Sequence, residues 1–141
     1  MVATINQRKG PLGLVVTGEA SWWQPALEQI IGPAWLTTYN VRGEGELLDV
    51  VEAGLADAAV LDDESELELD VLHLLRMIRR LDEAFPVVVV TRRRDRRWME
   101  NALSLTAFSV IAKPLELEML LRQIQRIMRR LDEMLRQDAD E

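Results

Sequence analysis

The chain contains no cysteine, a single histidine and no long apolar run, and each of these shortages excludes a class of function. Without cysteine, its 141 residues form no disulfide, build no thiolate zinc site and offer no cysteine nucleophile. The one histidine, His73, argues against histidine-rich metal sites, and we expect it at the surface rather than as a ligand. No apolar stretch approaches the ~20 residues that span a bilayer, and the polar N-terminus lacks the apolar segment of a signal peptide. We therefore expect a soluble cytoplasmic protein with no membrane partner.

Basic residues are also in the minority. The chain has 17 lysines and arginines against 24 acids, for a net charge of −7. Nucleic-acid binding requires a basic face, so we expect no nucleic-acid partner. In contrast, apolar residues make up 48% of the chain, and this length suffices for one domain with a full hydrophobic core.

Short apolar runs alternate with helical patterns five times along the chain. The runs at 14–17, 34–41, 56–63, 87–91 and 108–112 are rich in apolar and β-branched residues, which is typical of buried strands. The segments between and after them carry apolar residues at helical spacing. This alternation predicts an α/β fold, in which helices cover both faces of a parallel sheet. The expected helices span 22 or 23 to 31, 46–53, 68–85, 96–105 and 115–137.

Polar side chains stand at the carboxyl ends of three of the expected strands, where parallel sheets place their sites. Asp62 ends the third strand, Thr91 ends the fourth, and Lys113 follows the fifth. A carboxylate can accept a phosphoryl group, while a hydroxyl and an ammonium group bind the phosphoryl oxygens. Lys113 is one of only two lysines, and a compact ammonium suits a bridge between a carboxylate and a phosphoryl oxygen.

Three segments, in this order, resemble the receiver domain of bacterial response regulators. "ADAAVLD" is similar to the strand that ends in the phosphoacceptor, "FPVVVVT" to the strand that ends in a conserved hydroxyl, and "ALSLTAFSVIAKP" to the run into the lysine–proline pair. The resemblance covers Leu14 to Arg129. It implies Asp62 as phosphoacceptor, with Thr91 and Lys113 beside it and Pro114 next to the lysine. It also implies a flavodoxin-like, doubly wound five-stranded sheet of order 2-1-3-4-5 with five helices, and a histidine kinase as partner.

The sequence departs from this family at the metal site. Receivers usually end the first strand with two adjacent acids that hold Mg²⁺, whereas here Thr17 and Gly18 stand in those places and Glu19 follows. Magnesium favours several close carboxylate oxygens. Each lost charge partner at ~4 Å removes roughly 4 kcal/mol of attraction at an effective dielectric constant near 20. A site built from Asp62 and Glu19 is therefore expected to hold Mg²⁺ weakly or not at all, and no other cofactor is implied.

Two further departures favour a pseudo-receiver, in which the fold is retained and the phosphorylation switch is lost or altered. Val110 occupies the position of the family's aromatic switch residue, and the loop after Asp62 lacks the usual proline and glycine. In a pseudo-receiver, Lys113 serves to neutralise Asp62. We expect a stand-alone signalling protein that acts through protein contacts and is not an enzyme.

Two other functions stay open at this stage. The first is a working receiver that accepts a phosphoryl group from a histidine kinase, with Glu19 or Asp63 rebuilding the metal site. The second is a flavodoxin-like nucleotide or flavin binder. The loop "TGEASWW" lacks the glycines of a phosphate cradle, which speaks against this second function.

Two runs of opposite charge follow neighbouring strands. Residues 62–70 carry six acids and residues 92–97 carry five arginines. They are either two solvated loops, a network that pairs across the mouth of the site, or an arginine contact to phosphate or nucleic acid. Nearby, the adjacent Trp22 and Trp23 point about 100° apart on a helix, so one of them is expected to be exposed. Trp98 is expected to anchor its own helix.

The last helix is longer than the sheet requires. About 23 residues of helix extend about 35 Å, whereas a strand of five or six residues spans about 17–20 Å. Three apolar sets recur every seven residues: Leu117, Ile124 and Leu131; Leu120, Ile127 and Met134; Leu121, Met128 and Leu135.

We expect three parts along the chain: a flexible segment at 1–12, a receiver-like domain at 13–130, and an overhang of the last helix with an acidic tail at 131–141. Leu131, Met134 and Leu135 are expected past the sheet in water, which predicts a homodimer through the last helix. A chain cut after Arg129 is expected to be monomeric.

Overall fold

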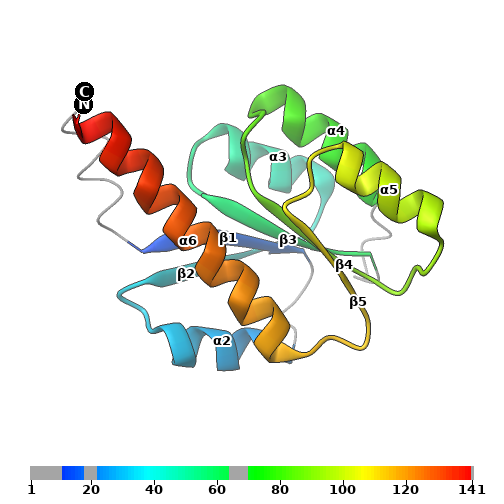
Figure 1. Ribbon diagram of the computed structural model, residues 1–141, viewed down its shortest axis with the longest axis horizontal. Helices are drawn as coiled ribbons and strands as arrows, with labels where there is room; N and C mark the ends of the chain where they lie inside the picture. The colour runs from blue at the N-terminus through cyan, green and yellow to red at the C-terminus, as the bar shows by residue number, and fades with distance from the viewer. Residues whose placement is uncertain (1–10, 18–21, 64–69, 141) are drawn as a thin grey trace.

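A computed structural model describes residues 11–17, 22–63 and 70–140 of the chain, with side chains up to Met134. In this part of the chain five strands alternate with five helices (Figure 1). The strands are β1 (Leu12–Thr17), β2 (Leu36–Val41), β3 (Ala58–Asp62), β4 (Val87–Thr91) and β5 (Ser109–Ala112). The helices are α2 (Trp23–Ile31), α3 (Glu44–Glu52), α4 (Val71–Leu81), α5 (Arg96–Ser104) and α6 (Leu117–Asp140).

All neighbouring strands pair in parallel, in the order β2-β1-β3-β4-β5. Helices α2 and α6 lie on one face of the sheet, and α3, α4 and α5 lie on the other (Figure 1). The predicted flavodoxin-like fold and its strand order are confirmed. Because every strand runs in the same direction, the ends of β3, β4 and β5 lie at one edge.

Each face of the sheet carries its own hydrophobic core. Leu27 of α2 and Ile124 of α6 pack on one face, while Leu75 and Ile78 of α4 pack on the other, and all four are fully buried. The valines of β4 are at most 1% exposed, so this strand is covered on both sides as its sequence predicts. The central strands are therefore a rigid support for the residues at their ends.

Several element boundaries differ from the predicted ones by two to four residues. Strand β1 begins at Leu12, which pairs with Leu36 of β2 and whose N–H donates to the Trp35 carbonyl at 2.8 Å. Helix α4 begins only at Val71, because the Asp70 side chain accepts a hydrogen bond from the His73 N–H and caps the helix. The remaining shifts are the starts of β2 at Leu36, β3 at Ala58, α3 at Glu44 and α6 at Leu117, and the ends of α4 at Leu81 and α6 at Asp140.

Helix α6 has 24 residues and crosses the sheet diagonally (Figure 1). Leu131, which was expected past the sheet in water, is partly buried against the core of the α2–α6 face. The diagonal path explains this difference, because it keeps the helix over the sheet for longer than a parallel path would. Met134 is 47% exposed. The overhang therefore begins after Leu131 rather than at it.

The guanidinium group of Arg79, near the end of α4, joins two loops to that helix. Its Nε donates to the Leu105 carbonyl at 2.9 Å and its Nη2 to the Thr106 carbonyl at 3.0 Å. Its Nη1 donates to the Phe85 carbonyl at 2.6 Å and to the Asp82 carbonyl at 3.3 Å. Burial lowers the pKa of Arg79, and the Asp82 carboxylate partly offsets that effect. One side chain thus satisfies carbonyls that helix ends leave without partners.

The predictions for the tryptophans at 22, 23 and 98 and for His73 are confirmed. Trp22 is 67% exposed and Trp23 is 2% exposed, and Trp98 is a buried residue of α5. His73 lies at the surface, where its Nε2 is 3.0 Å from Oε1 of Glu44. None of the helices within the described ranges is long and apolar enough to cross a membrane.

Candidate functional site

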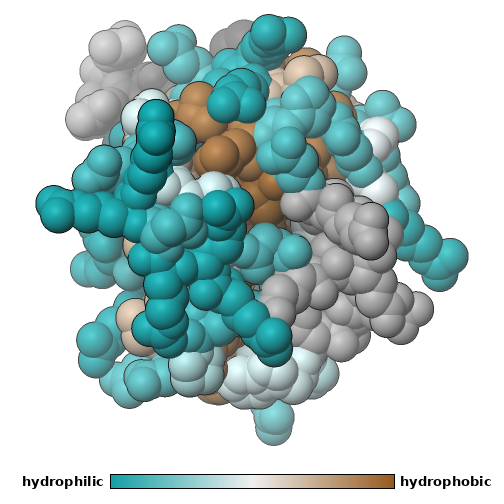
Figure 2. Space-filling model, turned by 90° about the vertical axis from the view of Figure 1, so that its right-hand side faces the viewer, coloured by the Kyte–Doolittle hydropathy of each residue, from teal (hydrophilic) through white to brown (hydrophobic). Residues whose placement is uncertain are grey.

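The face of the molecule at which the strands end is strongly hydrophilic. Figure 2 views it from the right-hand side of Figure 1, and hydrophilic side chains cover much of it around a smaller hydrophobic area. The arginine run, residues 92–97, follows β4 at this edge, and every residue in it is exposed. The candidate site lies at this edge.

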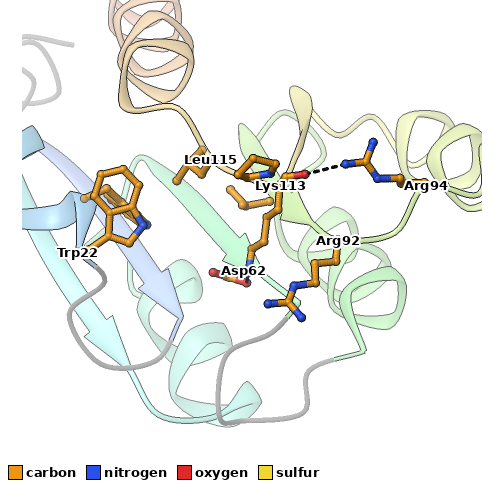
Figure 3. A pocket seen from close by; sticks show the side chains of 9 residues that line it. Trp22, Asp62, Arg92, Arg94, Lys113 and Leu115 are labelled. Atoms are coloured by element: carbon orange, nitrogen blue, oxygen red, sulfur yellow. Dashed lines mark hydrogen bonds and ion pairs between the residues drawn. The ribbon is translucent and has the colours of Figure 1, made fainter.

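Asp62 and Lys113 meet at the centre of the site (Figure 3). Asp62 is the last residue of β3, and Lys113 directly follows β5. The Nζ of Lys113 donates to Oδ1 of Asp62 at 2.8 Å, and each side chain is 19% exposed. The two residues are 51 positions apart in the chain, and the parallel sheet brings them into contact. A partly buried carboxylate is thus balanced by the ammonium group of the chain itself.

Backbone contacts fix both partners of this ion pair. The N–H of Asp62 donates to Oγ1 of Thr17, at the end of β1, at 3.0 Å. The N–H of Lys113 donates to the carbonyl of Thr91 at 2.8 Å. Thr17 is only 2% exposed, so its hydroxyl serves the backbone of Asp62 rather than the surface. This role of Thr17 has no signal in the sequence, where the residue stands out only as the replacement of an acid.

Thr91 does not join the ion pair. In the register of the sheet, Asp62 stands opposite Val90, so Thr91 lies level with the next residue, Asp63. The Thr91 hydroxyl donates to Oδ2 of Asp63 and accepts a hydrogen bond from the Arg93 N–H at 2.9 Å. Thr91 is fully buried, and Oδ1 of Asp63 is buried without a partner among the described residues. Of the three predicted site residues, the structure brings two together and pairs the third with Asp63.

Two carboxylates of the described residues lie where the family resemblance implies a Mg²⁺ site. These carboxylates belong to Asp62 and Asp63. The ammonium group of Lys113 forms an ion pair with Asp62, and the hydroxyl of Thr91 donates a hydrogen bond to Asp63. Magnesium needs an octahedral set of oxygen ligands. No group of three or more acidic or histidine side chains in the described ranges is arranged to hold a metal. Glu19, the other predicted ligand, lies outside the described residues.

The arrangement of helices and strands is similar to that of solved receiver domains. A CheY-like response regulator receiver domain protein from Methanospirillum hungatei matches with a TM-score of 0.71 and 17% identity, over 89% of this chain and 99% of its own. The chain has the receiver-domain fold. A two-component response regulator from Clostridium difficile matches with a TM-score of 0.70 and 19% identity, over 85% of this chain and 98% of its own. No family model matches the sequence, and no curated protein matches it significantly.

A third receiver-fold structure, a response regulator from Thermotoga maritima, matches with a TM-score of 0.67 and 22% identity, over 84% of this chain and 98% of its own. Within this receiver fold, Val110 lies on β5 at the position predicted for the aromatic switch residue. It is partly buried and packs against the core of the α3–α5 face.

The arginines after β4 make mostly local contacts in the described part of the receiver fold. Arg93 forms two hydrogen bonds to the Asp95 carboxylate, at 2.9 and 3.0 Å, and stacks over the Trp98 ring at 5.3 Å. This pairing lowers the pKa of Asp95 and raises the pKa of Arg93. Arg96 pairs with Glu100 one helical turn later. The acidic residues at 64–69 lie outside the described residues, so their pairing with the arginines stays a prediction.

A pocket of about 720 Å³ opens beside the Asp62–Lys113 pair. Trp22 stands on one side of the pocket, Arg92 and Arg94 stand on the other, and the ion pair lies between them (Figure 3). The sequence signalled these side chains separately, as a tryptophan doublet and an arginine run, but only the fold places them around one space. Its lining residues are Trp22, Trp23, Asp62, Val90, Arg92, Arg94, Lys113, Pro114 and Leu115.

Proposed function

We propose that this chain is a receiver-like signalling protein of a two-component or phosphorelay pathway. It acts in the cytoplasm through contacts with a histidine kinase or another signalling protein, not as an enzyme. Asp62 occupies the phosphoacceptor position, and the Mg²⁺ site is degraded. The observation that carries the proposal is the 2.8 Å ion pair between Asp62 and Lys113 at the carboxyl edge of a receiver fold.

The presence of Thr17 at the end of β1 is an argument for a degraded metal site. At a position where the family resemblance implies a metal-binding acid, its neutral hydroxyl accepts the hydrogen bond from the Asp62 N–H. Phosphoryl transfer develops negative charge that a metal ion normally neutralises. Without that ion, Lys113 is a cation in contact with Asp62, and its positive charge is already balanced by the carboxylate. We therefore expect slow phosphorylation or none.

Incubation with acetyl phosphate and Mg²⁺ is expected to leave the intact mass of the protein unchanged. A working receiver domain in the same reaction serves as the positive control. The measurement is mass spectrometry of the intact chain. A mass gain of one phosphoryl group that disappears in Asp62→Ala would overturn the pseudo-receiver assignment and make the chain a phosphorylatable receiver.

A restored variant makes this experiment sharper. Thr17→Asp combined with Gly18→Asp returns two acids to the end of β1, where the family resemblance implies them. We expect this variant to gain the mass of a phosphoryl group in the presence of Mg²⁺, and to lose that gain in EDTA. Failure of the restored variant would show that the missing acids are not the cause.

We also propose that the end of α6 pairs with a second copy of the chain. Met134 is 47% exposed and lies one heptad after Ile127, which is fully buried on the same helix. Leu135 continues the third apolar set. An amphipathic helix that extends past its own domain gains stability by burying such residues against a partner helix.

The intact chain is expected to sediment as a dimer, and the double substitution Met134→Glu and Leu135→Glu as a monomer. Both residues follow Leu131, so the folded domain is expected to keep its circular dichroism spectrum. Met119→Glu is the matched control, because Met119 is 44% exposed at the start of the same helix. These substitutions are preferable to a cut after Arg129, which would also remove the packing of Leu131. A monomeric intact chain would contradict the proposal.

A further inference from the structure

One row of residues near the end of α6 carries opposite charges on the two sides of an exposed methionine. Residues four apart on a helix form a row along its surface. Arg130, Met134 and Asp138 form such a row. Arg130 is exposed, Met134 is 47% exposed, and α6 continues as a helix past position 138 to Asp140. A cation, an apolar residue and an acid therefore follow one another at intervals of one turn.

This row continues the stripe by which α6 packs on its own sheet. Ile127 is fully buried in the core of the α2–α6 face, and Met134 follows it by two helical turns. The helix crosses the sheet diagonally and its end extends past the strands (Figure 1). Asp138 stands one heptad after Leu131, where the apolar pattern would otherwise continue. A second α6 helix that covers Met134 must therefore also accommodate an acid.

A parallel arrangement of two α6 helices conflicts with this row. In a parallel pair, each residue lies level with its own counterpart in the other copy. Asp138 would then face a second aspartate, and Arg130 would face a second arginine. Like charges that face each other across an interface destabilise it. The row therefore disfavours the parallel orientation at two places.

An antiparallel arrangement makes the same row self-complementary. With Met134 at the two-fold axis, Arg130 stands one turn before the axis and Asp138 one turn after it. Reversal of one helix brings each arginine level with the aspartate of the other copy. Because a two-fold interface is isologous, this contact forms twice. Opposite charges across an interface fix its orientation, so the row favours the antiparallel pair.

The end of α6 supplies a second, independent argument. The last carbonyl groups of a helix carry a partial negative charge, which nearby basic side chains stabilise. The last turn of α6 has no basic residue, and the chain ends with Asp138, Asp140 and Glu141. In an antiparallel pair, the exposed Arg129 and Arg130 of the other copy lie near this end. Each copy then supplies the cations that the helix end of the other lacks.

We propose that a second copy of the chain binds antiparallel along the end of α6, with Met134 at the two-fold axis. This inference rests on the proposed dimer and specifies its geometry. Helix α6 begins shortly after Lys113, so the two Asp62–Lys113 pairs lie towards opposite ends of the dimer. The two α6 helices then begin about 50 Å apart along their axes. Such a dimer can hold two signalling partners at once, one at each end.

The test is a pair of distances in the full-length dimer, measured by double electron–electron resonance. The chain has no cysteine, so one introduced cysteine carries the only spin label. Met119→Cys and Gln125→Cys are suitable, because both residues are exposed on α6. In the antiparallel dimer, the two labels are expected about 45 Å apart at position 119 and about 30 Å apart at position 125. In a parallel dimer, the separation would not shorten in this way.

The charge on Asp138 gives a second readout. Asp138→Ala is expected to raise the Kd of the dimer about fivefold, because it removes an attraction that forms twice. In a parallel dimer, the same substitution would relieve a repulsion and lower the Kd. Asp132→Ala is the matched control, since Asp132 is an exposed acid of the same helix that lies outside the row. It is expected to stay within about twofold of wild type. Sedimentation gives each Kd, and circular dichroism verifies that the variants are folded.

Two results would overturn the orientation and leave the proposed dimer intact. The first is a label separation at position 125 that is no shorter than the separation at position 119. The second is an Asp138→Ala dimer that is at least as tight as the Asp132→Ala dimer. An intact chain that sediments as a monomer overturns the dimer and the orientation together. The phosphorylation experiment tests a separate edge of the domain and is unaffected by any of these results.

Discussion

Lys113→Met is expected to lower the free energy of unfolding by about 2 kcal/mol. The substitution leaves the Asp62 carboxylate without the ammonium group that contacts it at 2.8 Å. Breaking a fully buried ion pair costs about 3–5 kcal/mol, and an exposed pair contributes less than about 1 kcal/mol. Both side chains are 19% exposed, so water compensates part of the loss. Urea unfolding at a single protein concentration measures the difference.

The double variant Asp62→Asn and Lys113→Met is expected to recover more than half of that loss, because it removes both charges together. Arg122→Met is the matched control: it breaks an exposed pair with Glu118 on α6 and is expected to change stability by less than about 0.5 kcal/mol. A double variant no more stable than the sum of the two single changes would show that the pair is not coupled.

Arg79→Ala is expected to lower the free energy of unfolding by about 3 kcal/mol. The lost guanidinium group donates hydrogen bonds to four carbonyl oxygens at N···O distances of 2.6 to 3.3 Å. In the variant, each of these carbonyls would need a hydrogen bond from water instead. Hydrogen bonds from a charged donor contribute roughly 1.5–3 kcal/mol each, but four bonds from one group are not additive. Urea unfolding gives the stability, and amide hydrogen exchange near Thr106 locates the change.

Arg79→Lys and Arg80→Ala define what the guanidinium contributes. A lysine keeps the charge but has a single nitrogen, so it is expected to recover less than half of the stability. Arg80 is the exposed neighbour on the same helix, and its substitution is expected to be within about 0.5 kcal/mol of wild type. If Arg79→Ala and Arg80→Ala have the same free energy of unfolding, the hydrogen bonds of Arg79 to the loops do not stabilise the fold.

The fold was predictable because each strand carries its own local signal. The four consecutive valines of β4 required a strand covered on both faces, and the structure buries all of them. The boundaries of the helices were less predictable, because hydrogen bonds to the ends of a helix decide where it begins. The Asp70 side chain starts α4 later than its apolar pattern suggests, and the Glu116 carbonyl accepts the N–H groups of both Met119 and Leu120 at the start of α6.

The site was predictable only in part. Asp62 and Lys113 stand at strand ends, and strand ends converge in any parallel sheet, so their contact followed from topology alone. The partner of Thr91 depended on register: a shift of one residue between β3 and β4 sets Thr91 against Asp63 rather than Asp62. Likewise, the burial of Leu131 depended on the diagonal path of α6, which no local pattern encodes.

The hydrogen bond between Thr91 and Asp63 has a consequence for how the molecule could carry information. A group added to Asp62 can attract the hydroxyl of the fully buried Thr91 only by first breaking its partly buried bond to Asp63. We therefore expect the end of β4 to respond little to a change at Asp62. A partner that docks on this edge would meet the same rigid shape at all times, and regulation would come from which molecules are present rather than from a rearrangement of the domain.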